Sequence, residues 1–275
     1  MAEFEVVHDG VTLRGDDTGE GTPVVLLHGL TASRRYVVMG SKALERSGHR
    51  VIHYDARGHG TSSRAADPAG YTYAALAEDL LAILDDRGID RAVLAGASMG
   101  AHTALRAALA APHRVAGIVA ITPAYDEAAF GDERSLARWD ALSAGLRAGG
   151  IDGFVAAYGV EDVPEAWRAT IETVLRQRLA THDDLDALAD ALVAIPRSRP
   201  FRAISDLLVL QTPVTVVADR DEADPGHPLA TGEAYARAID GAELVVEEEG
   251  KSPLAWQGGQ LSKVIAALAD RAFPG

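Results

Sequence analysis

Short apolar runs alternate with amphipathic segments along most of the chain. Runs rich in Val, Ile and Leu predict strands at 22–29, within 50–60 before a Gly-rich turn, and at 91–97, 114–121, 212–218 and 242–248. Three amphipathic segments predict helices at 72–88, 100–111 and near the end of the chain, where apolar residues recur at helical spacing. In the first of them Thr72 is the expected N-cap and Gly88 the expected end, and one face carries Leu76, Leu80, Ile83 and Leu84. Strands separated by helix-length segments predict an α/β fold with a mainly parallel sheet of about eight strands, flanked by helices on both faces.

The alternation stops between residues 124 and 205. This stretch shows helical patterns only and contains two of the three tryptophans, Trp139 and Trp167. A helical insertion between two strands of a parallel sheet is typical of a cap, so we expect a core formed by 1–123 and 206–275 and a helical cap (lid) at 124–205. Phe154 and Tyr158, with the two tryptophans, are expected to supply an inner apolar face. The alternative is a long packing insertion with no role at the site.

Composition excludes several classes of function. The net charge of −14 argues against nucleic acid or an anionic membrane surface as a partner, because both attract basic proteins. The chain has no cysteine, which excludes disulfides, thiolate metal sites and a cysteine nucleophile. No basic start precedes an apolar run, and no apolar run approaches the roughly 18 residues of a membrane span. We therefore expect a soluble, cytoplasmic protein.

The pentapeptide Gly96-Ala97-Ser98-Met99-Gly100 fits the G-x-S-x-G pattern of a serine nucleophile. It follows a predicted strand and opens a predicted helix, which is the context that this motif requires. In such a turn the serine is presented at the carboxyl edge of the sheet, and the helix N-terminus behind it favours developing negative charge. The alternative is a Gly-rich turn with an idle serine.

Two further motifs stand at the ends of predicted strands. His28-Gly29 ends the strand at 22–29, and the stretch "DARGHGTS" beginning at Asp55 ends the next one. With the G-x-S-x-G turn, in this order and spacing, the chain resembles the α/β-hydrolase superfamily of lidded esterases and lipases over roughly residues 20–122 and 205–270. The resemblance implies the α/β-hydrolase fold, with an eight-stranded, mainly parallel sheet and a helical cap.

The resemblance also implies roles for particular residues. Ser98 is the nucleophile, and the backbone N–H groups of Leu30 and Met99 form the oxyanion hole. Asp221 matches the position of the family's catalytic acid best, with Asp219 and Asp224 as near alternatives. His28 resembles a structural histidine of the family, and His59 is assigned no chemistry. No cofactor is implied. The aspartates near His227 match no calcium loop and offer a single nitrogen ligand, so no metal is expected.

The histidine that acts as base in this family follows the last strand, but the matching turn here is Gly250-Lys251-Ser252-Pro253, and no histidine lies beyond His227. His227 is one substitute, because it keeps the order serine, acid, histidine and has a suitable ordinary pKa of about 6.5. Its obstacle is reach, since its loop starts two strands from Ser98, roughly 10 Å at the usual spacing. Lys251 is another, although a lysine beside the glutamates 247–249 in a charged surface turn is expected to stay protonated. His102, one helical turn after Ser98, is expected to be a packing histidine.

These observations leave three hypotheses. The first is a serine hydrolase that acts on small or medium carboxylic esters or thioesters through an acyl-Ser98 intermediate, weakened by a non-standard triad. The second is a binding protein that holds a small apolar ligand without turnover, and the third is an acyltransferase that uses the same Ser98 chemistry.

Overall fold

The computed structural model describes residues 2–160, 164–220, 226–249 and 256–273. In these residues one eight-stranded sheet has the order β1-β2-β4-β3-β5-β6-β7-β8. β1 pairs antiparallel with β2, and β2 pairs antiparallel with β4, while all other neighbours are parallel. The expected α/β-hydrolase fold is confirmed. The strands are β1 (Ala2–His8), β2 (Val11–Thr18), β3 (Thr22–Leu27), β4 (His49–Asp55), β5 (Ala92–Ala97), β6 (Val115–Ile121), β7 (Val214–Ala218) and β8 (Glu243–Val246).

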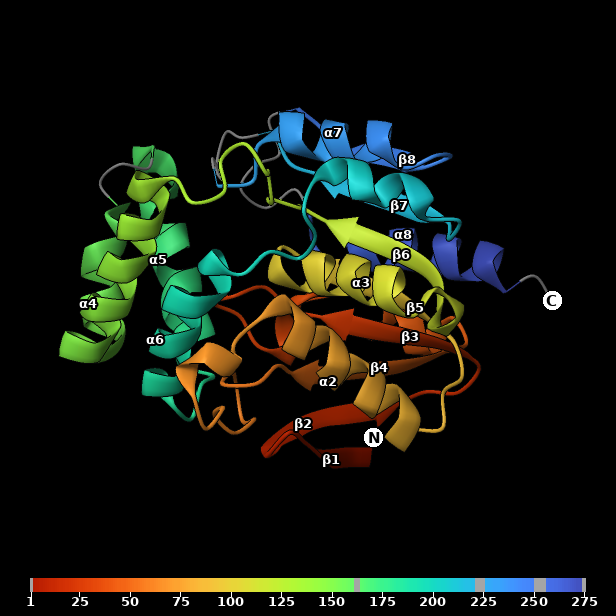
Figure 1. Ribbon diagram of the computed structural model, residues 1–275, viewed down its shortest axis with the longest axis horizontal. Coiled ribbons are helices and arrows are strands. Elements are labelled where there is room, and N and C mark those ends of the chain that lie inside the picture. Colours follow the sequence, from red (N-terminus) through yellow and green to blue (C-terminus); the bar gives the residue numbers. More distant parts are fainter. Residues whose placement is uncertain (1, 161–163, 221–225, 250–255, 274–275) are drawn as a thin grey trace.

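Helices cover both faces of the sheet (Figure 1). They are α1 (Ala43–Arg46), α2 (Tyr73–Asp86), α3 (Met99–Ala110), α4 (Glu133–Tyr158), α5 (Glu165–Leu179), α6 (Leu185–Ala194), α7 (Leu229–Ala238) and α8 (Gly258–Ala272). None of the helices in the described ranges is long and apolar enough to cross a membrane.

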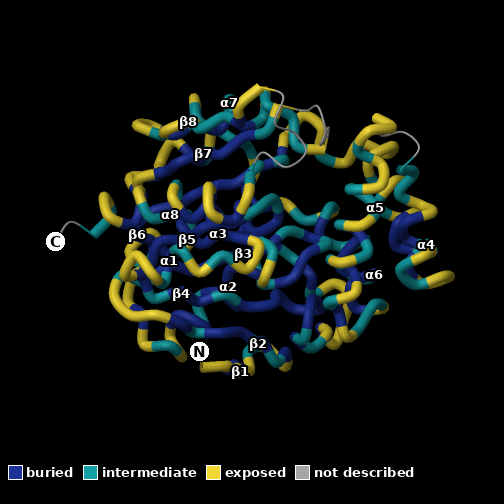
Figure 2. The backbone as a smooth tube through the Cα atoms, turned by 180° about the vertical axis from the view of Figure 1, so that it is seen from behind, coloured by how far each residue is buried: buried dark blue, intermediate teal, exposed yellow. Residues whose placement is uncertain are grey.

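Successive side chains of the central strands point to opposite faces of the sheet and so join two separate apolar layers. In β3, Val25 and Leu27 join the layer under α2 and α3, whereas Val24 and Leu26 join the layer under α1 and α8. All four side chains are buried, because helices exclude water on both sides. Figure 2 shows this buried interior running through the middle of the molecule, with exposed residues on the outer sides of the helices.

Helix α2 forms where the pattern predicts it. Thr72 Oγ1 accepts a hydrogen bond from Ala75 N, and Gly88 follows the helix with a φ of 63°. The expected apolar face of α2 packs on the sheet with each side chain at most 2% exposed. The N-cap and the helix end are both confirmed.

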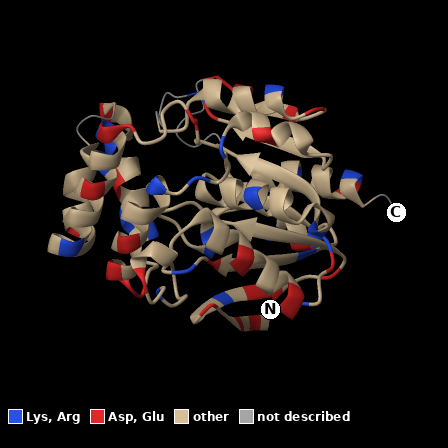
Figure 3. Cartoon of the chain, viewed as in Figure 1, with Lys and Arg blue, Asp and Glu red and all other residues tan. Residues whose placement is uncertain are grey.

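Helices α4, α5 and α6 come between β6 and β7 in the chain and gather beyond the end of the sheet toward which β6 points (Figure 1). No strand occurs in the described residues of 124–205. The insertion is tied to the core by Arg64, whose guanidinium donates two 2.7 Å hydrogen bonds to Asp184, and by Asp183 N, which donates to Gly60 O. Acidic side chains are spread over the insertion, the core helices and the β1–β2 hairpin (Figure 3).

Gly100 offers a test of how closely α3 approaches the sheet. A Cβ at Gly100 would lie 2.1 Å from Leu27 O in β3. Gly100→Ala should therefore lower the free energy of unfolding by about 3 kcal/mol, because backbone cannot move aside like a flexible side chain. Urea denaturation measures the difference.

The matched control is Gly259→Ala. Gly259 is also the second residue of its helix, α8, and an added Cβ there meets nothing within 4 Å. This variant should be about 0.5 kcal/mol more stable than the parent, because alanine has less conformational freedom in the unfolded chain. Equal stability of the two variants would contradict the close approach of α3.

Candidate active site

Ser98 lies in a sharp turn between β5 and α3, with φ 50° and ψ −108°. A residue with a side chain is strained in this region of backbone conformation. The turn closes only because both flanking glycines lack a Cβ. A Cβ at Gly96 would lie 2.2 Å from the Gly100 carbonyl, and a Cβ at Gly100 would overlap the backbone of β3. Ser98 N donates to Ile121 O of the neighbouring strand β6. Tertiary packing thus holds the strained serine at the carboxyl edge of the sheet.

His227 is the histidine that the structure brings to Ser98. Its Nε2 lies 2.9 Å from Ser98 Oγ, a hydrogen-bonding distance at which a proton can pass between the two atoms. The ring is half-buried. His227 stands between β7 and α7, two residues before α7, and reaches Ser98 in spite of the two-strand separation that the sequence posed as an obstacle.

The position of His227 depends on how α7 is docked. Gly232 lets α7 approach β7, since a Cβ there would lie 2.8 Å from the Ala218 side chain. One turn later Tyr235 is fully buried and donates to Tyr125 O, 2.9 Å away, in the segment after β6. These two contacts dock α7 against β7 and the segment after β6, and His227 lies two residues before the first residue of that helix.

The turn after β3 lies beside the serine, with an ideal Cβ at Gly29 only 3.7 Å from Ser98 Cβ. Gly29 O accepts hydrogen bonds from Ala32 N and from His28 Nδ1. His28 Nε2 accepts from Ala56 N, so the ring proton resides on Nδ1, and burial lowers the pKa of His28 to about 3. Because C=O and N–H point in opposite directions in a trans peptide, holding Gly29 O also fixes the direction of the Leu30 N–H.

The N–H of Met99 is the second donor that the sequence resemblance implied. Met99 is the first residue of α3, and the first N–H groups of a helix have no acceptor within that helix. The helix dipole and these free N–H groups favour an anion at the start of the helix.

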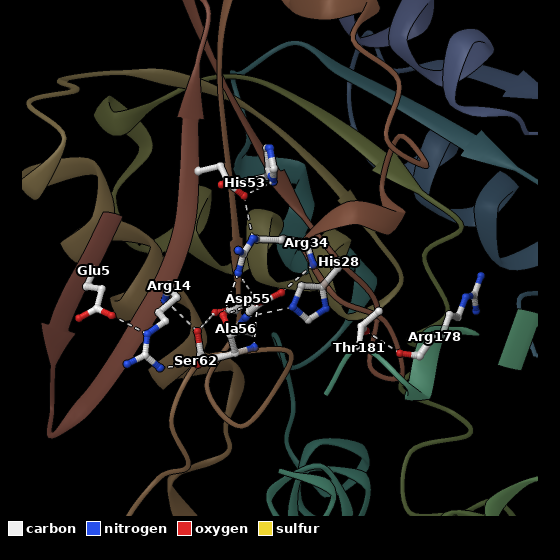
Figure 4. A network of polar contacts seen from close by, with 12 residues as sticks. Glu5, Arg14, His28, Arg34, His53, Asp55, Ala56, Ser62, Arg178 and Thr181 are labelled. Carbon is white, nitrogen blue, oxygen red and sulfur yellow. Dashed lines mark hydrogen bonds and ion pairs between the residues drawn. The ribbon is translucent and has the colours of Figure 1, made fainter. Parts of the chain in front are cut away.

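The buried carboxylate of Asp55, the last residue of β4, anchors the far end of the turn after β3. Asp55 accepts hydrogen bonds from Arg34 N and Arg34 Nη1 (Figure 4). It also accepts one from Thr61 N, and Arg34 pairs with Asp16 as well. Burial alone would raise the pKa of Asp55, but the surrounding His28, Arg34 and Thr61 groups keep it below the usual value. Asp55 is therefore charged at neutral pH and serves as an internal anchor.

His102 is a packing histidine, as expected. It is 4% exposed, and its Nε2 accepts hydrogen bonds from Ala124 N and Tyr125 N. The ring proton therefore lies on Nδ1, which faces Tyr73 Oη at 3.2 Å. Burial, followed by the neighbouring His227, lowers the pKa of His102 to about 3.

Several of the predicted site residues lie outside the described part of the chain. These are Asp221, Asp224 and Lys251, so the acid and the lysine turn stay predictions. Asp219, the other alternative acid, is described, and its Oδ1 is buried. The described residues contain no group of three or more potential metal ligands.

Glu247 is a buried carboxylate at the end of the predicted strand 242–248. It is 4% exposed, and its carboxylate accepts from Arg220 N at 2.7 Å. Glu247 directly follows β8, and its own N–H donates to Ala218 O at the end of β7. This backbone hydrogen bond extends the pairing of β7 and β8 by one residue. It joins the segment after β8 to the end of β7 and places the Glu247 side chain in the interior. The local sequence held no signal of this burial.

Comparison with known proteins agrees with the fold. The sequence model of the family described as "alpha/beta hydrolase fold" matches residues 22–157. RutD of Variovorax paradoxus (strain S110), named as a candidate carbamate hydrolase, is 34% identical over 209 residues, which cover 74% of this chain and 75% of the relative. The chain belongs to the α/β-hydrolase fold family. An epoxide hydrolase of Caballeronia sordidicola is 32% identical over 122 residues, 44% of this chain and 37% of that protein.

Solved structures match almost the whole chain. Est816, described as an N-acyl homoserine lactone degrading enzyme, superposes with a TM-score of 0.72 at 26% identity and covers 96% of this chain and 97% of its own. An esterase from Thermogutta terrifontis gives a TM-score of 0.78 over 99% of both chains at 24% identity, a likeness of fold alone. The relatives are hydrolases, which supports a hydrolase in general terms.

The strain at Ser98 can be measured with two variants that both remove the hydroxyl. Ser98→Gly should be about 1 kcal/mol more stable than Ser98→Ala, because glycine adopts φ 50° without strain and this gain exceeds its greater freedom in the unfolded chain. The free energy of unfolding of each variant in urea provides the comparison. If alanine proves the more stable residue, the turn is not strained.

Buried neutral histidines should weaken the fold in acid. His102 ionises with a pKa near 6.5 in the unfolded chain but about 3 in the folded protein, so as the pH falls below 6.5 only the unfolded chain gains the proton. Stability is lost progressively until the pH reaches the folded pKa. In His102→Gln, whose amide oxygen can accept from Ala124 N and Tyr125 N, the loss between pH 7 and pH 5 should be smaller by about 2 kcal/mol.

The exposed His113 supplies the control, because His113→Gln should leave the loss of stability between pH 7 and pH 5 unchanged. Urea titrations at the two pH values test both variants. A His102→Gln protein that loses as much stability as the parent would show that His102 is not held neutral.

Proposed function

We propose that this protein is a serine hydrolase in which Ser98 is the nucleophile and His227 the base. The observation that carries the proposal is the 2.9 Å separation of His227 Nε2 and Ser98 Oγ. An ordinary serine hydroxyl is a weak nucleophile, and a histidine at this distance can accept its proton as the oxygen attacks. In this proposal the base comes from the loop after β7, and Lys251 takes no part in proton transfer.

The steps follow from the positions of these groups. Ser98 Oγ attacks the carbonyl carbon of the substrate while its proton passes to His227 Nε2. The N–H groups of Leu30 and Met99 stabilise the negative charge that develops on the carbonyl oxygen. His227 then returns the proton to the leaving group, and a water molecule, deprotonated by the same ring, releases the acid from Ser98. We assign Asp221 to the orientation of His227 from its place in the sequence.

The preferred substrates are small or medium carboxylic esters or thioesters. A Ser–His pair beside two N–H donors suits an acyl carbon, because charge develops on a carbonyl oxygen during attack. The names of RutD, Est816 and the Thermogutta esterase refer to a carbamate, a lactone and esters, which all contain such a carbon. We further propose that residues 124–205 act as a cap that shapes the acyl pocket.

Hydrolysis of a short activated ester tests the assignment. Ser98→Ala and His227→Ala should each reduce kcat/KM by about 10³-fold or more, because the nucleophile and its base act as one unit. Lys251→Ala should retain activity, and the exposed His113→Ala serves as the matched histidine control. Rates are measured by release of p-nitrophenol from p-nitrophenyl acetate between pH 5 and pH 9.

Labelling with a fluorophosphonate probe separates the alternatives. The parent should gain one adduct in its intact mass, and Ser98→Ala should gain none. Loss of activity only in Lys251→Ala would transfer the role of base to that lysine. No adduct and no Ser98-dependent turnover would favour the binding protein, whereas faster acyl release with added alcohols would favour the acyltransferase.

A further inference from the structure

His59 is a fully buried ring next to the turn that carries Leu30. It is 1% exposed and stands in the tight segment after β4, where His59 N donates to Ala56 O and Ser62 N donates to His59 O. Two other imidazoles flank it. The His28 ring centroid lies 5.1 Å away, and that of His182, from the insertion, lies 5.8 Å away. The mechanism proposed above gives His59 no role.

Both ring nitrogens of His59 face carbonyl oxygens. Nδ1 lies 2.8 Å from Arg57 O, and Nε2 lies 2.8 Å from Leu30 O. A neutral imidazole carries one N–H, so only one of these contacts can be a hydrogen bond at a time. Burial lowers the pKa of His59, although the two carbonyl contacts and Asp55 oppose that shift, so the ring is neutral at pH 7.

The two contacts differ in what maintains them. Arg57 is two residues away, and the backbone of the turn holds its oxygen near the ring whether or not a proton lies between them. Leu30 is 29 residues away, on a different segment. Arg34 and Asp55 join the segment after β3 to the end of β4, but Arg34 lies four residues beyond Leu30. The Leu30 carbonyl itself contacts the segment after β4 through His59. An approach of 2.8 Å between two lone pairs would be repulsive there, so this contact requires an N–H donor.

We propose that His59 is a positioning residue that carries its proton on Nε2 and holds the Leu30 carbonyl, thereby fixing the oxyanion turn against the segment after β4. His28 secures the peptide that contains the Leu30 N–H, and His59 secures the next peptide along the chain. With both carbonyls held, the Leu30 N–H cannot rotate away from Ser98. This inference rests on the proposed function, because the direction of that N–H affects turnover only if Leu30 serves as an oxyanion donor.

Three substitutions separate the donor from the ring. In His59→Gln the amide nitrogen takes the place of Nε2, in His59→Asn it takes the place of Nδ1, and His59→Phe keeps a ring without a donor. We expect His59→Phe and His59→Asn to lower kcat for p-nitrophenyl acetate about 10- to 100-fold with little change in KM, since misplacing a group by about 1 Å costs this much. His59→Gln should restore most of the lost rate.

His182→Phe is the matched control, because the His182 ring lies 5.8 Å from that of His59, centroid to centroid, and the structure shows no hydrogen bond from it to Leu30 among the described residues. It should keep kcat within about threefold of the parent, since no positioned group is lost. Equal losses in the Gln, Asn and Phe variants of His59 would reduce His59 to a packing residue and overturn the proposal.

A measurement on the unmodified protein keeps the test independent of both folding and turnover. Imidazole ¹⁵N–¹H spectra, with His59 assigned by its absence in the variants or by sequential assignment, report which nitrogen carries the proton. We expect a proton on Nε2 at pH 7, and a bare Nε2 would overturn the proposal. If Nε2 is protonated but the parent shows no Ser98-dependent turnover, the proposed function fails while the hydrogen bond to Leu30 stands.

Discussion

The backbone of α3 passes so close to β3 and to its own preceding strand that only glycine fits at two positions. The Gly100 Cα faces the Leu27 carbonyl, and Gly96 faces the Gly100 carbonyl. This approach forces Ser98 into a conformation that a side chain resists, and the hydrogen bond from Ser98 N to Ile121 O keeps it there. The same approach puts the end of β3, and therefore Gly29, against the serine. The conformation of Ser98 and the nearness of the turn after β3 are thus two results of one packing constraint.

Residues outside the reacting pair hold the loops around Ser98 in place. Asp55, 1% exposed and charged, collects donors from Arg34 and Thr61 and joins the segments after β3 and β4. Gly232 and Tyr235 do the same for α7. The side chains of Asp55 and Tyr235 are buried, where an unpaired polar group would cost about 1–3 kcal/mol, so these loops cannot easily exchange partners. The candidate site is consequently held by its surroundings rather than by the reacting groups.

The fold was predictable because its main signals are local. The N-cap at Thr72, the apolar spacing of α2 and the G-x-S-x-G pattern around Ser98 can each be recognised within a few residues of sequence. Strand β2 was not predicted, since "VTLRGDDT" has few apolar residues and becomes a strand through pairing with β1 and β4. The buried state of Glu247 and the contact between His59 and Leu30 depend on partners 27 and 29 residues away, which no periodicity reveals. The contact between His227 and Ser98 was partly predictable. The order serine, acid, histidine along the chain made His227 a candidate, but whether its ring reaches Ser98 depends on the three-dimensional structure.

The contact between His227 and Ser98 joins two residues 129 positions apart, and His227 precedes β8 in the chain. A motif search that demands a histidine beyond the last strand would classify this chain as a degenerate member of its family. The same search would overlook any homologue in which the imidazole has moved to the neighbouring loop. Surveys of apparently inactive α/β hydrolases would gain by asking which ring lies next to the serine in space, whatever its order in the sequence.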